Sequence, residues 1–464
     1  MRLITGGPDC RQAKNAGASR QLLGAVLLLA ALLLTGCGQT EASKDPAIMG
    51  TLDAQGAQRR SGLAEAFRSG PNFAGVSADE SRTAEVGRDV LTAGGNAIDA
   101  AVAMYFTLAV TLPSAASLDA AGVCIAHNAK TKVGEAFAFP PTPAPGPING
   151  VAFNVPIGVR AMALMHIRHG SLRWEQLVAP AERLARFGVP VSRALARDLQ
   201  AGASLLGGDR EARRIYGKGT GNAVTEGDTF TQADLAGTLG VLRQYGGSEM
   251  FQGRIARLLS EQIAQLGGSL PLEALRNAVP QAGPPAGDKY GGHRVYVAQP
   301  PMGGADAMAG WNGGPAPAAA GGADSGGIAG FIAVDQNGSA VACNVSMGQL
   351  FGARIVVPGT GILLATPASA AAISPMLIAN PGNGEFVFAG AAGGTPSAGY
   401  AIGAFARATV DSGQPLGRAL AARAGQGGWI NAAVCPGGIR GGGGTCQSVT
   451  DPAGGGLTLS ANPR

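Results

Sequence analysis

The clearest pattern in the chain is a pair of apolar runs between residues 328 and 345. Ile328 to Val334 is uninterrupted by polar residues, and Ser339 to Val345 is a second strand-like run. The segment between them, Asp335 to Gly338, ends in Asn-Gly, which predicts a β-hairpin. Because neither run shows a clean alternation with polar residues, both faces of the sheet should be covered. We therefore expect this hairpin to form the core.

Helical spacing of apolar residues begins near residue 77. Ser77 and Glu80 have the spacing of a capping box, which predicts a helix N-terminus there. A second helix should begin at Asn96 or Asp99, and its strongly apolar sequence requires burial. Asp99 could be catalytic, but an acidic residue in the first turn also complements the helix dipole. We favour that structural role.

The N-terminal region resembles a bacterial lipoprotein signal. Leu22 to Leu34 is an apolar run behind a positively charged segment, and it is short for a membrane span. Leu-Thr-Gly-Cys at 34–37 resembles a lipobox, so Cys37 would be acylated and become the mature N-terminus. Gly38 suggests sorting to the periplasmic face of the outer membrane. Residues 1–36 would be the signal peptide and 37–74 a tether; a plain secretory signal with a chance cysteine is the alternative.

Composition and charge narrow the possible partners. The 464 residues suffice for one large domain or two ordinary ones, and 14% charged residues with 75 glycines make the chain Ala/Gly-rich. The net charge of +5 falls to about +2 without the four basic residues and one aspartate before Cys37. No basic stripe with interleaved aromatics is present, which argues against nucleic acid as a partner. His166 and His169 lack a third ligand for zinc. No other metal, nucleotide or redox motif is visible, so no cofactor is expected.

Four cysteines follow Cys37 in the chain. An even number in an exported protein allows three pairings. Cys435 and Cys446 flank a glycine-rich loop, and we expect a disulfide between them. Cys124 and Cys343 each lie in a strand-like run, where they could bridge neighbouring strands or remain buried thiols.

Several separated motifs resemble those of the gamma-glutamyltranspeptidases and keep the family's order from about residue 75 to 425. They are GGNAIDAAVA (94–103), SLDAAGVC (117–124), RHGSLRW (168–174), QPPMGG (299–304), GGIAGFIAVDQNGSAVAC (326–343) and FGARIVVPGTGILL (351–364). Members of this family are N-terminal-nucleophile hydrolases, so the resemblance implies an α+β fold, a four-layer αββα sandwich. It also implies a division into a large-subunit-like region (75–304), a Pro/Gly/Ala-rich junction (305–324), a small-subunit-like core (325–430) and a glycine-rich tail with a Cys pair (431–464).

The resemblance places the reaction centre at the start of the first hairpin strand. In the family a threonine there becomes a free N-terminus by self-cleavage, so that its hydroxyl and α-amine supply nucleophile and base. This chain has Ile328 at that position. The family's glutamate-binding groups are also replaced: an arginine by Pro140, two serines by Ala371 and Ala372, and an asparagine by Gly348, while an acidic motif is absent.

Two features of the family's site are kept in part. Ser346 replaces a threonine that supports the nucleophile. Gly393-Gly394 corresponds to the glycine pair whose backbone amides form the oxyanion hole. Such donors need no side chain, but a glycine pair can equally serve a tight turn, and both interpretations stay open.

The sequence leaves two hypotheses for function. In the first, the chain is a non-catalytic lipoprotein that keeps the fold for binding, because the nucleophile and the glutamate-binding groups are missing together. In the second, it is an active gamma-glutamyltransferase or amide hydrolase of a divergent branch, acting on glutathione-like or other acyl amides. Ser325, beside Asp324, would then be the nucleophile, and a small-molecule or peptide amide the substrate.

Overall fold

The computed structural model describes residues 73–202, 208–218, 222–316, 327–423, 428–442 and 445–461. The predicted signal, Cys37, the tether up to residue 72 and Ser325 lie outside these ranges, whereas Ala74, predicted as the end of the tether, is the first residue of strand β1 (Ala74–Ala78). Among the described residues, no helix is both long enough and apolar enough to cross a membrane.

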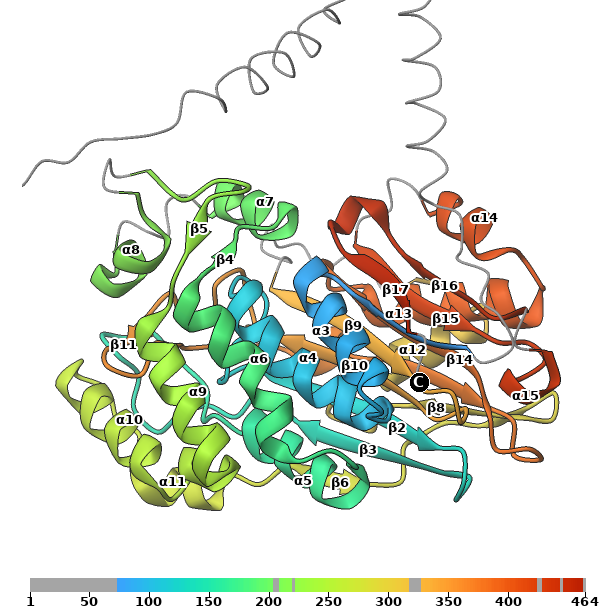
Figure 1. The fold of residues 1–464 in the computed structure, drawn as a ribbon, viewed down its shortest axis with the longest axis horizontal. Helices are drawn as coiled ribbons and strands as arrows, with labels where there is room; N and C mark the ends of the chain where they lie inside the picture. The colour runs from blue at the N-terminus through green and yellow to red at the C-terminus, as the bar shows by residue number, and fades with distance from the viewer. Residues whose placement is uncertain are drawn as a thin grey trace, which may run out of the picture. The chain divides into compact units, whose positions relative to one another are not determined.

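Two antiparallel sheets form the centre of the described chain (Figure 1). In the described residues, the first sheet has seven strands in the order β17-β1-β9-β10-β2-β3-β6, and the second has six in the order β16-β15-β14-β13-β8-β7. The strands of the first sheet are β1 (Ala74–Ala78), β2 (Ala121–Asn128), β3 (Val133–Phe139), β6 (Gln281–Gly283), β9 (Ile328–Val334), β10 (Ala340–Ser346) and β17 (Leu457–Ala461). Those of the second sheet are β7 (Lys289–Tyr290), β8 (His293–Val297), β13 (Met376–Ala379), β14 (Phe386–Gly393), β15 (Trp429–Val434) and β16 (Gln447–Thr450).

Helices cover the outer face of each sheet. On the first sheet, α3 contacts β1 and α4 contacts β9 and β10; on the second, α13 contacts β14 and α12 contacts β8. The helices are α3 (Ser81–Thr92), α4 (Ala97–Thr111), α5 (Gly158–His169), α6 (Trp174–Phe187), α7 (Arg193–Ala201), α8 (Arg210–Tyr216), α9 (Ala233–Tyr245), α10 (Arg254–Gln265), α11 (Leu272–Asn277), α12 (Gly304–Trp311), α13 (Ala398–Ala406), α14 (Leu416–Ala421) and α15 (Ile439–Gly442). Short strand pairs β4–β5 (Val189–Pro190, Thr229–Phe230) and β11–β12 (Val356–Val357, Ile362–Leu363) complete the fold. This is the predicted αββα sandwich.

The predicted hairpin is confirmed as β9 and β10. All residues of both strands are buried. Phe331 packs in the cluster under the helices, whereas its neighbour Ile332 packs between the two sheets. Two apolar surroundings, one on each face, explain why the run lacks polar alternation. In the turn, the Asp335 side chain accepts hydrogen bonds from the amides of Asn337 and Ser339, at 2.9 and 3.1 Å.

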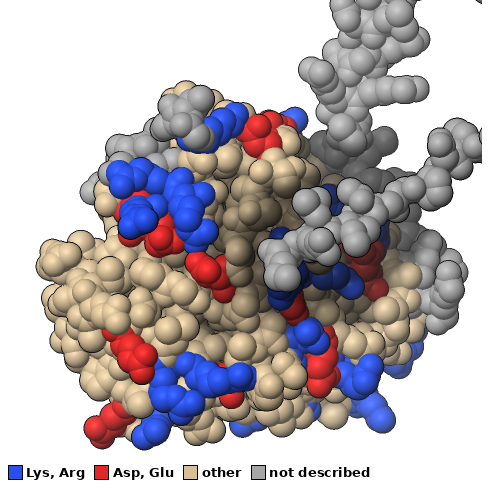
Figure 2. Space-filling view, turned by 60° about the vertical axis from the view of Figure 1, so that its left-hand side comes forward, with Lys and Arg blue, Asp and Glu red and all other residues tan. Residues whose placement is uncertain are grey.

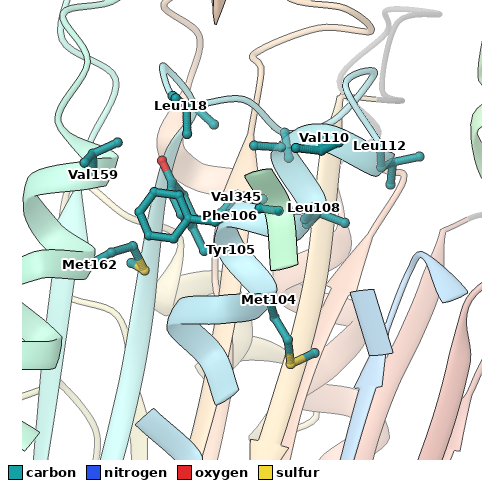
Figure 3. Close-up of a cluster of buried hydrophobic side chains, with 14 of the residues drawn as sticks. Met104, Tyr105, Phe106, Leu108, Val110, Leu112, Leu118, Val159, Met162 and Val345 are labelled. Atoms are coloured by element: carbon teal, nitrogen blue, oxygen red, sulfur yellow. The ribbon is translucent and has the colours of Figure 1, made fainter. Parts of the chain in front are cut away.

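The central helix α4 is buried along its whole length. Its side chains Tyr105 and Phe106 form part of the apolar cluster in Figure 3, against Met162 and Val159 of α5. Asn96 and Asp99 form a reciprocal capping box at its N-terminus. The helix therefore begins where the sequence predicted. Its apolar side chains face other elements on every side, as expected for a helix that is hydrophobic all round.

The capping box predicted at Ser77 is wrong. Ser77 lies inside β1, and the helix that follows is capped instead by Glu80, whose side chain accepts hydrogen bonds from the amides of Arg82 and Thr83. The serine is part of a buried strand because its neighbours are small and apolar. Spacing alone could not separate the two roles.

The C-terminal residues contribute more to the sheets than the sequence indicated. What looked like a glycine-rich tail contains β16 and β17, and β17 pairs with β1 in the first sheet. Disulfides join Cys435 to Cys446 and Cys124 to Cys343. The second bridge links directly paired positions of β2 and β10, so the pairing that the sequence left open is a cross-strand disulfide.

Charged side chains of both signs lie next to one another on the face shown in Figure 2. Ion pairs such as Arg214–Asp234 at 2.6 Å and Arg186–Glu182 at 2.7 Å are typical of this mixing. Exposed pairs of this kind contribute little to stability.

Candidate functional site

The site predicted from the family lies at one end of the first sheet. Ile328 is the first residue of β9 and pairs with Ser346, the last residue of β10. Ser346 pairs on its other side with Ala121 at the start of β2. Ile328 is 8% exposed. Its hydrocarbon side chain carries no hydroxyl, thiol or amine that could act as a nucleophile or a base.

Gly393 and Gly394 face Ile328 from the second sheet. The Gly394 amide donates a hydrogen bond to the Ile328 carbonyl at 3.1 Å, and Gly394 has a φ of +74°. A methyl group on Gly393 would lie 2.7 Å from the Ile328 carbonyl oxygen and 2.7 Å from Asp79 Oδ2. Glycine is thus required here for close approach and for the turn. The Gly394 amide already donates to the Ile328 carbonyl. An oxyanion hole, by contrast, needs amide donors that are free to bind the substrate's oxyanion.

Ser346 also makes a local contact. Its Oγ accepts a hydrogen bond from the Gly348 amide at 3.0 Å, and Gly348 has a φ of +82°. Next along the chain, the Met347 carbonyl accepts hydrogen bonds from both the amide and the hydroxyl of Thr366. The Ser346 hydroxyl therefore stabilises the turn that follows β10, and the residue itself is paired with Ile328.

Two positions that the resemblance assigns to glutamate binding, Pro140 and Ala371, lie within two residues of members of one apolar cluster, Ala138 and Ala370. Ala371 belongs to a short 3₁₀ turn, and its carbonyl oxygen would lie 1.7 Å from a methyl group on Gly303. Pro140 directly follows β3. The neighbouring buried side chains, including Ala121, Met302 and Ile373, form one apolar cluster. The cluster presents hydrocarbon side chains at this place in the fold.

Asp79 is a buried acid at this end that the sequence did not reveal. It follows β1 and is 2% exposed. Its Oδ2 accepts from the Gly330 amide at 2.7 Å, and its Oδ1 accepts from Asn431 Nδ2 at 2.5 Å. Burial raises the pKa of Asp79 to about 7, although the hydrogen bonds from Gly330 and Asn431 oppose this rise. Asn431 in turn accepts from the hydroxyls of Ser77 and Thr450, both at 2.8 Å.

Asp119 is a second buried acid, and it lies two residues before strand β2. It is 1% exposed, and its Oδ2 accepts a hydrogen bond from the Ala365 amide at 2.8 Å. Burial raises the pKa of Asp119 well above its usual value. The Ala365 carbonyl accepts from the Asn154 amide at 3.0 Å, so Asp119 helps to fix the segment that leads away from Leu364.

The other acidic and histidine residues considered from the sequence have structural partners. Asp99 accepts hydrogen bonds from the Ser171 amide at 3.0 Å and from its hydroxyl at 2.5 Å. This supports the structural role that we favoured. His166 bonds to the Leu172 carbonyl at 2.8 Å, whereas His169 bonds to Glu135 at 2.7 Å. The two histidines therefore serve separate contacts.

Residues 83–312 match the family model of gamma-glutamyltranspeptidase. The chain belongs to the gamma-glutamyltranspeptidase family. It is 30% identical over 247 residues to the glutathione hydrolase proenzyme of Escherichia coli, a match that covers 49% of this chain and 42% of the relative. It is 29% identical over 243 residues to the glutathione hydrolase proenzyme of Bacillus subtilis, covering 47% and 40%. The matched part thus spans about two fifths of the length of these relatives.

The gamma-glutamyltranspeptidase family model ends at residue 312, before β9 begins. For the remaining residues the fold is supported by a solved structure, the cephalosporin acylase from Bacillus halodurans. It is similar with a TM-score of 0.69 at 18% identity, over 85% of this chain and 96% of the acylase. At this identity the likeness shows a shared N-terminal-nucleophile hydrolase fold and says nothing of the reaction.

Proposed function

We propose that this protein is a non-catalytic member of the gamma-glutamyltranspeptidase family that keeps the fold for binding. The observation that carries the proposal is Ile328 at the first position of β9. Self-cleavage in this fold needs a hydroxyl or thiol at the new N-terminus, and acyl transfer needs the same group as nucleophile. A hydrocarbon side chain supports neither step.

Two further features support the proposal. The Gly394 amide donates to the Ile328 carbonyl, so one of the two expected oxyanion donors already has an acceptor. Pro140 and Ala371 lie where the family binds the glutamate carboxylate, and neither side chain can donate a hydrogen bond. The loss therefore includes nucleophile, anion stabilisation and substrate recognition together.

We expect the purified protein to remain one chain, with no fragment that begins at Ile328. Turnover of a γ-glutamyl anilide should stay at background, since an oxyanion hole without a nucleophile supplies only a small part of the acceleration. Ile328→Thr alone should not restore transfer, because Pro140, Ala371 and Ala372 still fail to bind the glutamate carboxylate. Denaturing gels, intact mass and the anilide assay measure these outcomes.

A specific result would overturn the proposal in favour of the second hypothesis. It is a two-chain form whose smaller chain starts at Ser325, with turnover that Ser325→Ala abolishes. Such a result would make Ser325 the nucleophile of an active amide hydrolase or acyltransferase. Ser339→Ala serves as a matched control, because that serine lies at the opposite end of β9, in the turn before β10.

We also propose that the protein is anchored through lipid on Cys37, at the periplasmic face of the outer membrane. The support is the lipobox-like sequence behind a short apolar run. Radiolabelled palmitate should be incorporated into wild-type protein and not into Cys37→Ala, because Cys37 is the residue that would be acylated. The wild-type protein should also fractionate with membranes, since several acyl chains anchor a lipoprotein stably. Cys10→Ala should keep the label, since that cysteine precedes the apolar run. Wild-type protein found only in the soluble periplasmic fraction would contradict the anchor.

A further inference from the structure

A groove lies between the two sheets, away from the β9 site. Its volume is about 550 Å³, within the range of roughly 300–1,000 Å³ that is usual for ligand pockets. One side comes from the start of β3, and the other from β8 and the segment that leads into β7. A methyl group on Gly134 of β3 would lie 2.8 Å from the ring of Tyr296 of β8, so the two strands face each other here.

The charged side chains of this lining are mostly cationic. They are Lys132, Lys289 and Arg294 against one acid, Asp288. Three positive charges and one negative give the groove a net charge of about +2. A groove lined by one predominant sign of charge attracts ligands of the other sign, so this one favours an anion.

The two cations of the second sheet lie directly opposite each other. Lys289 of β7 pairs with Arg294 of β8 in antiparallel register, so their side chains share one face of the sheet. On its other side Arg294 pairs with Ala379, which carries no charge. Like charges at directly opposite positions destabilise a sheet. In the part of the chain that the structure describes, neither cation forms an ion pair with an acid.

This cationic pair lies on the face of the sheet that turns toward the groove. Along β8, Val295 packs against the helices of the second sheet, whereas Tyr296 packs between the sheets. Arg294 precedes Tyr296 by two residues and therefore shares its face. The charge of Arg294 also opposes the rise that burial causes in the pKa of Tyr296. On the opposite face of β7, the ring of Tyr290 contacts that of Trp311, with 5.0 Å between centroids.

The first sheet adds a third cation and hydrocarbon. Lys132 donates a hydrogen bond from Nζ to the Gly382 carbonyl, which fixes the side chain between the turns of the two sheets. Val133 beside it is 58% exposed, and Pro284 is a further apolar residue of the lining. A ligand larger than a single anion would bury part of this hydrocarbon and gain affinity from it.

We propose that this groove binds a phosphate monoester. Such a group carries about 1.5 to 2 negative charges at pH 7, enough to neutralise both Lys289 and Arg294, whereas a carboxylate neutralises only one cation. The Arg294 fork would take two phosphate oxygens and the Lys289 ammonium the third. The rest of the ligand would contact Val133 and Pro284. The site goes beyond the function proposed above, because it uses no residue of the β9 end and its test needs no turnover.

Titration calorimetry of the full-length protein with phenyl phosphate and phenyl sulfate tests the charge requirement. The two probes share the phenyl group, but the sulfate carries only one negative charge. In a phosphate-free buffer at pH 8, phenyl phosphate should bind at least about tenfold more tightly, the equivalent of one charged hydrogen bond. The buffer should have low ionic strength, because salt screens exposed charges.

Lys289→Gln and Arg294→Gln should each weaken phenyl phosphate by about tenfold, because each removes one charged donor. Without ligand, Lys289→Gln should keep or raise Tm, because it removes the repulsion between directly opposed cations. A loss of binding without a loss of stability separates the ligand site from folding. Lys130→Gln is the matched control: this exposed lysine lies in the turn before β3 but does not line the groove, so its variant should bind like wild type.

Vesicles of equimolar phosphatidic acid and phosphatidylcholine distinguish a lipid headgroup from a free ester. The Cys37→Ala protein is used, so that the proposed anchor does not contribute. Sedimentation with these vesicles that Lys289→Gln weakens would make the ligand a lipid headgroup, whereas binding of phenyl phosphate alone would make it a free ester. No detectable binding of phenyl phosphate, equal affinity for phenyl sulfate, or unchanged affinity in both Lys289→Gln and Arg294→Gln would each overturn the proposal. None of these results depends on whether the β9 site is catalytic.

Discussion

Asparagine in place of Asp79 is expected to remove a pH dependence of about 4 kcal/mol from the free energy of unfolding. The pKa of Asp79 is about 7 in the folded protein, against 3.8 for an ordinary aspartate. A difference of this size corresponds to about 1.4 kcal/mol per pKa unit. Because the folded state retains the proton more strongly, this stabilisation is complete below pH 3.8, declines as pH rises, and is lost once pH passes 7.

The measurement is urea unfolding of wild type and Asp79→Asn at several values between about pH 4 and 8. The difference between the two curves isolates Asp79, since Asp119, Asp198 and Asp335, whose pKa values burial also raises, titrate in both. Relative to Asp79→Asn, which stays uncharged like the protonated acid, wild type should lose about 4 kcal/mol of stability between the acid end and pH 7. Asp89→Asn, at a side chain 65% exposed, should follow wild type. Parallel curves for wild type and Asp79→Asn would contradict the prediction.

Local patterns carried most of the correct fold prediction. The β9–β10 hairpin and helix α4 were predicted because each has its own turn or cap, in Asn337-Gly338 and Asn96. Local pattern was misleading where distant contacts decide the conformation. Ser77 has the spacing of a helix cap but belongs to β1, a buried strand that pairs with β9 and β17. The strands β16 and β17 were missed because each is four or five residues long within glycine-rich sequence.

The candidate site was only partly predictable, for a physical reason. The family's motifs placed Ile328, Ser346 and Gly394 in one site, and the strand register brings them together. The contact between Asp79 and Asn431 joins residues 352 positions apart, and nothing near either residue indicates the other. Whether the Gly394 amide is free or engaged also depends on how the two sheets meet, which local sequence does not specify.

Alanine in place of Gly393 is expected to destabilise the protein by about 3 kcal/mol, the upper end for an overpacked core. The new methyl group would lie 2.7 Å from Asp79 Oδ2, 2.7 Å from the Ile328 carbonyl oxygen and 2.9 Å from Trp429 Nε1. The carbonyl belongs to β9 and cannot turn away, so the two sheets must separate slightly at this point. Urea unfolding at pH 6 gives the change in the free energy of unfolding.

Gly237→Ala is the matched control for Gly393→Ala. Gly237 is an exposed residue within α9, and a methyl group on it would have no other atom within 4 Å. Alanine favours the helix over glycine by about 1 kcal/mol, so this variant should be slightly more stable than wild type. Opposite signs for the two substitutions would show that close approach of β14 to β9, and not backbone entropy, requires glycine at 393. A Gly393→Ala variant as stable as wild type would mean that Ile328, Gly394 and Asp79 are less tightly packed than the distances imply.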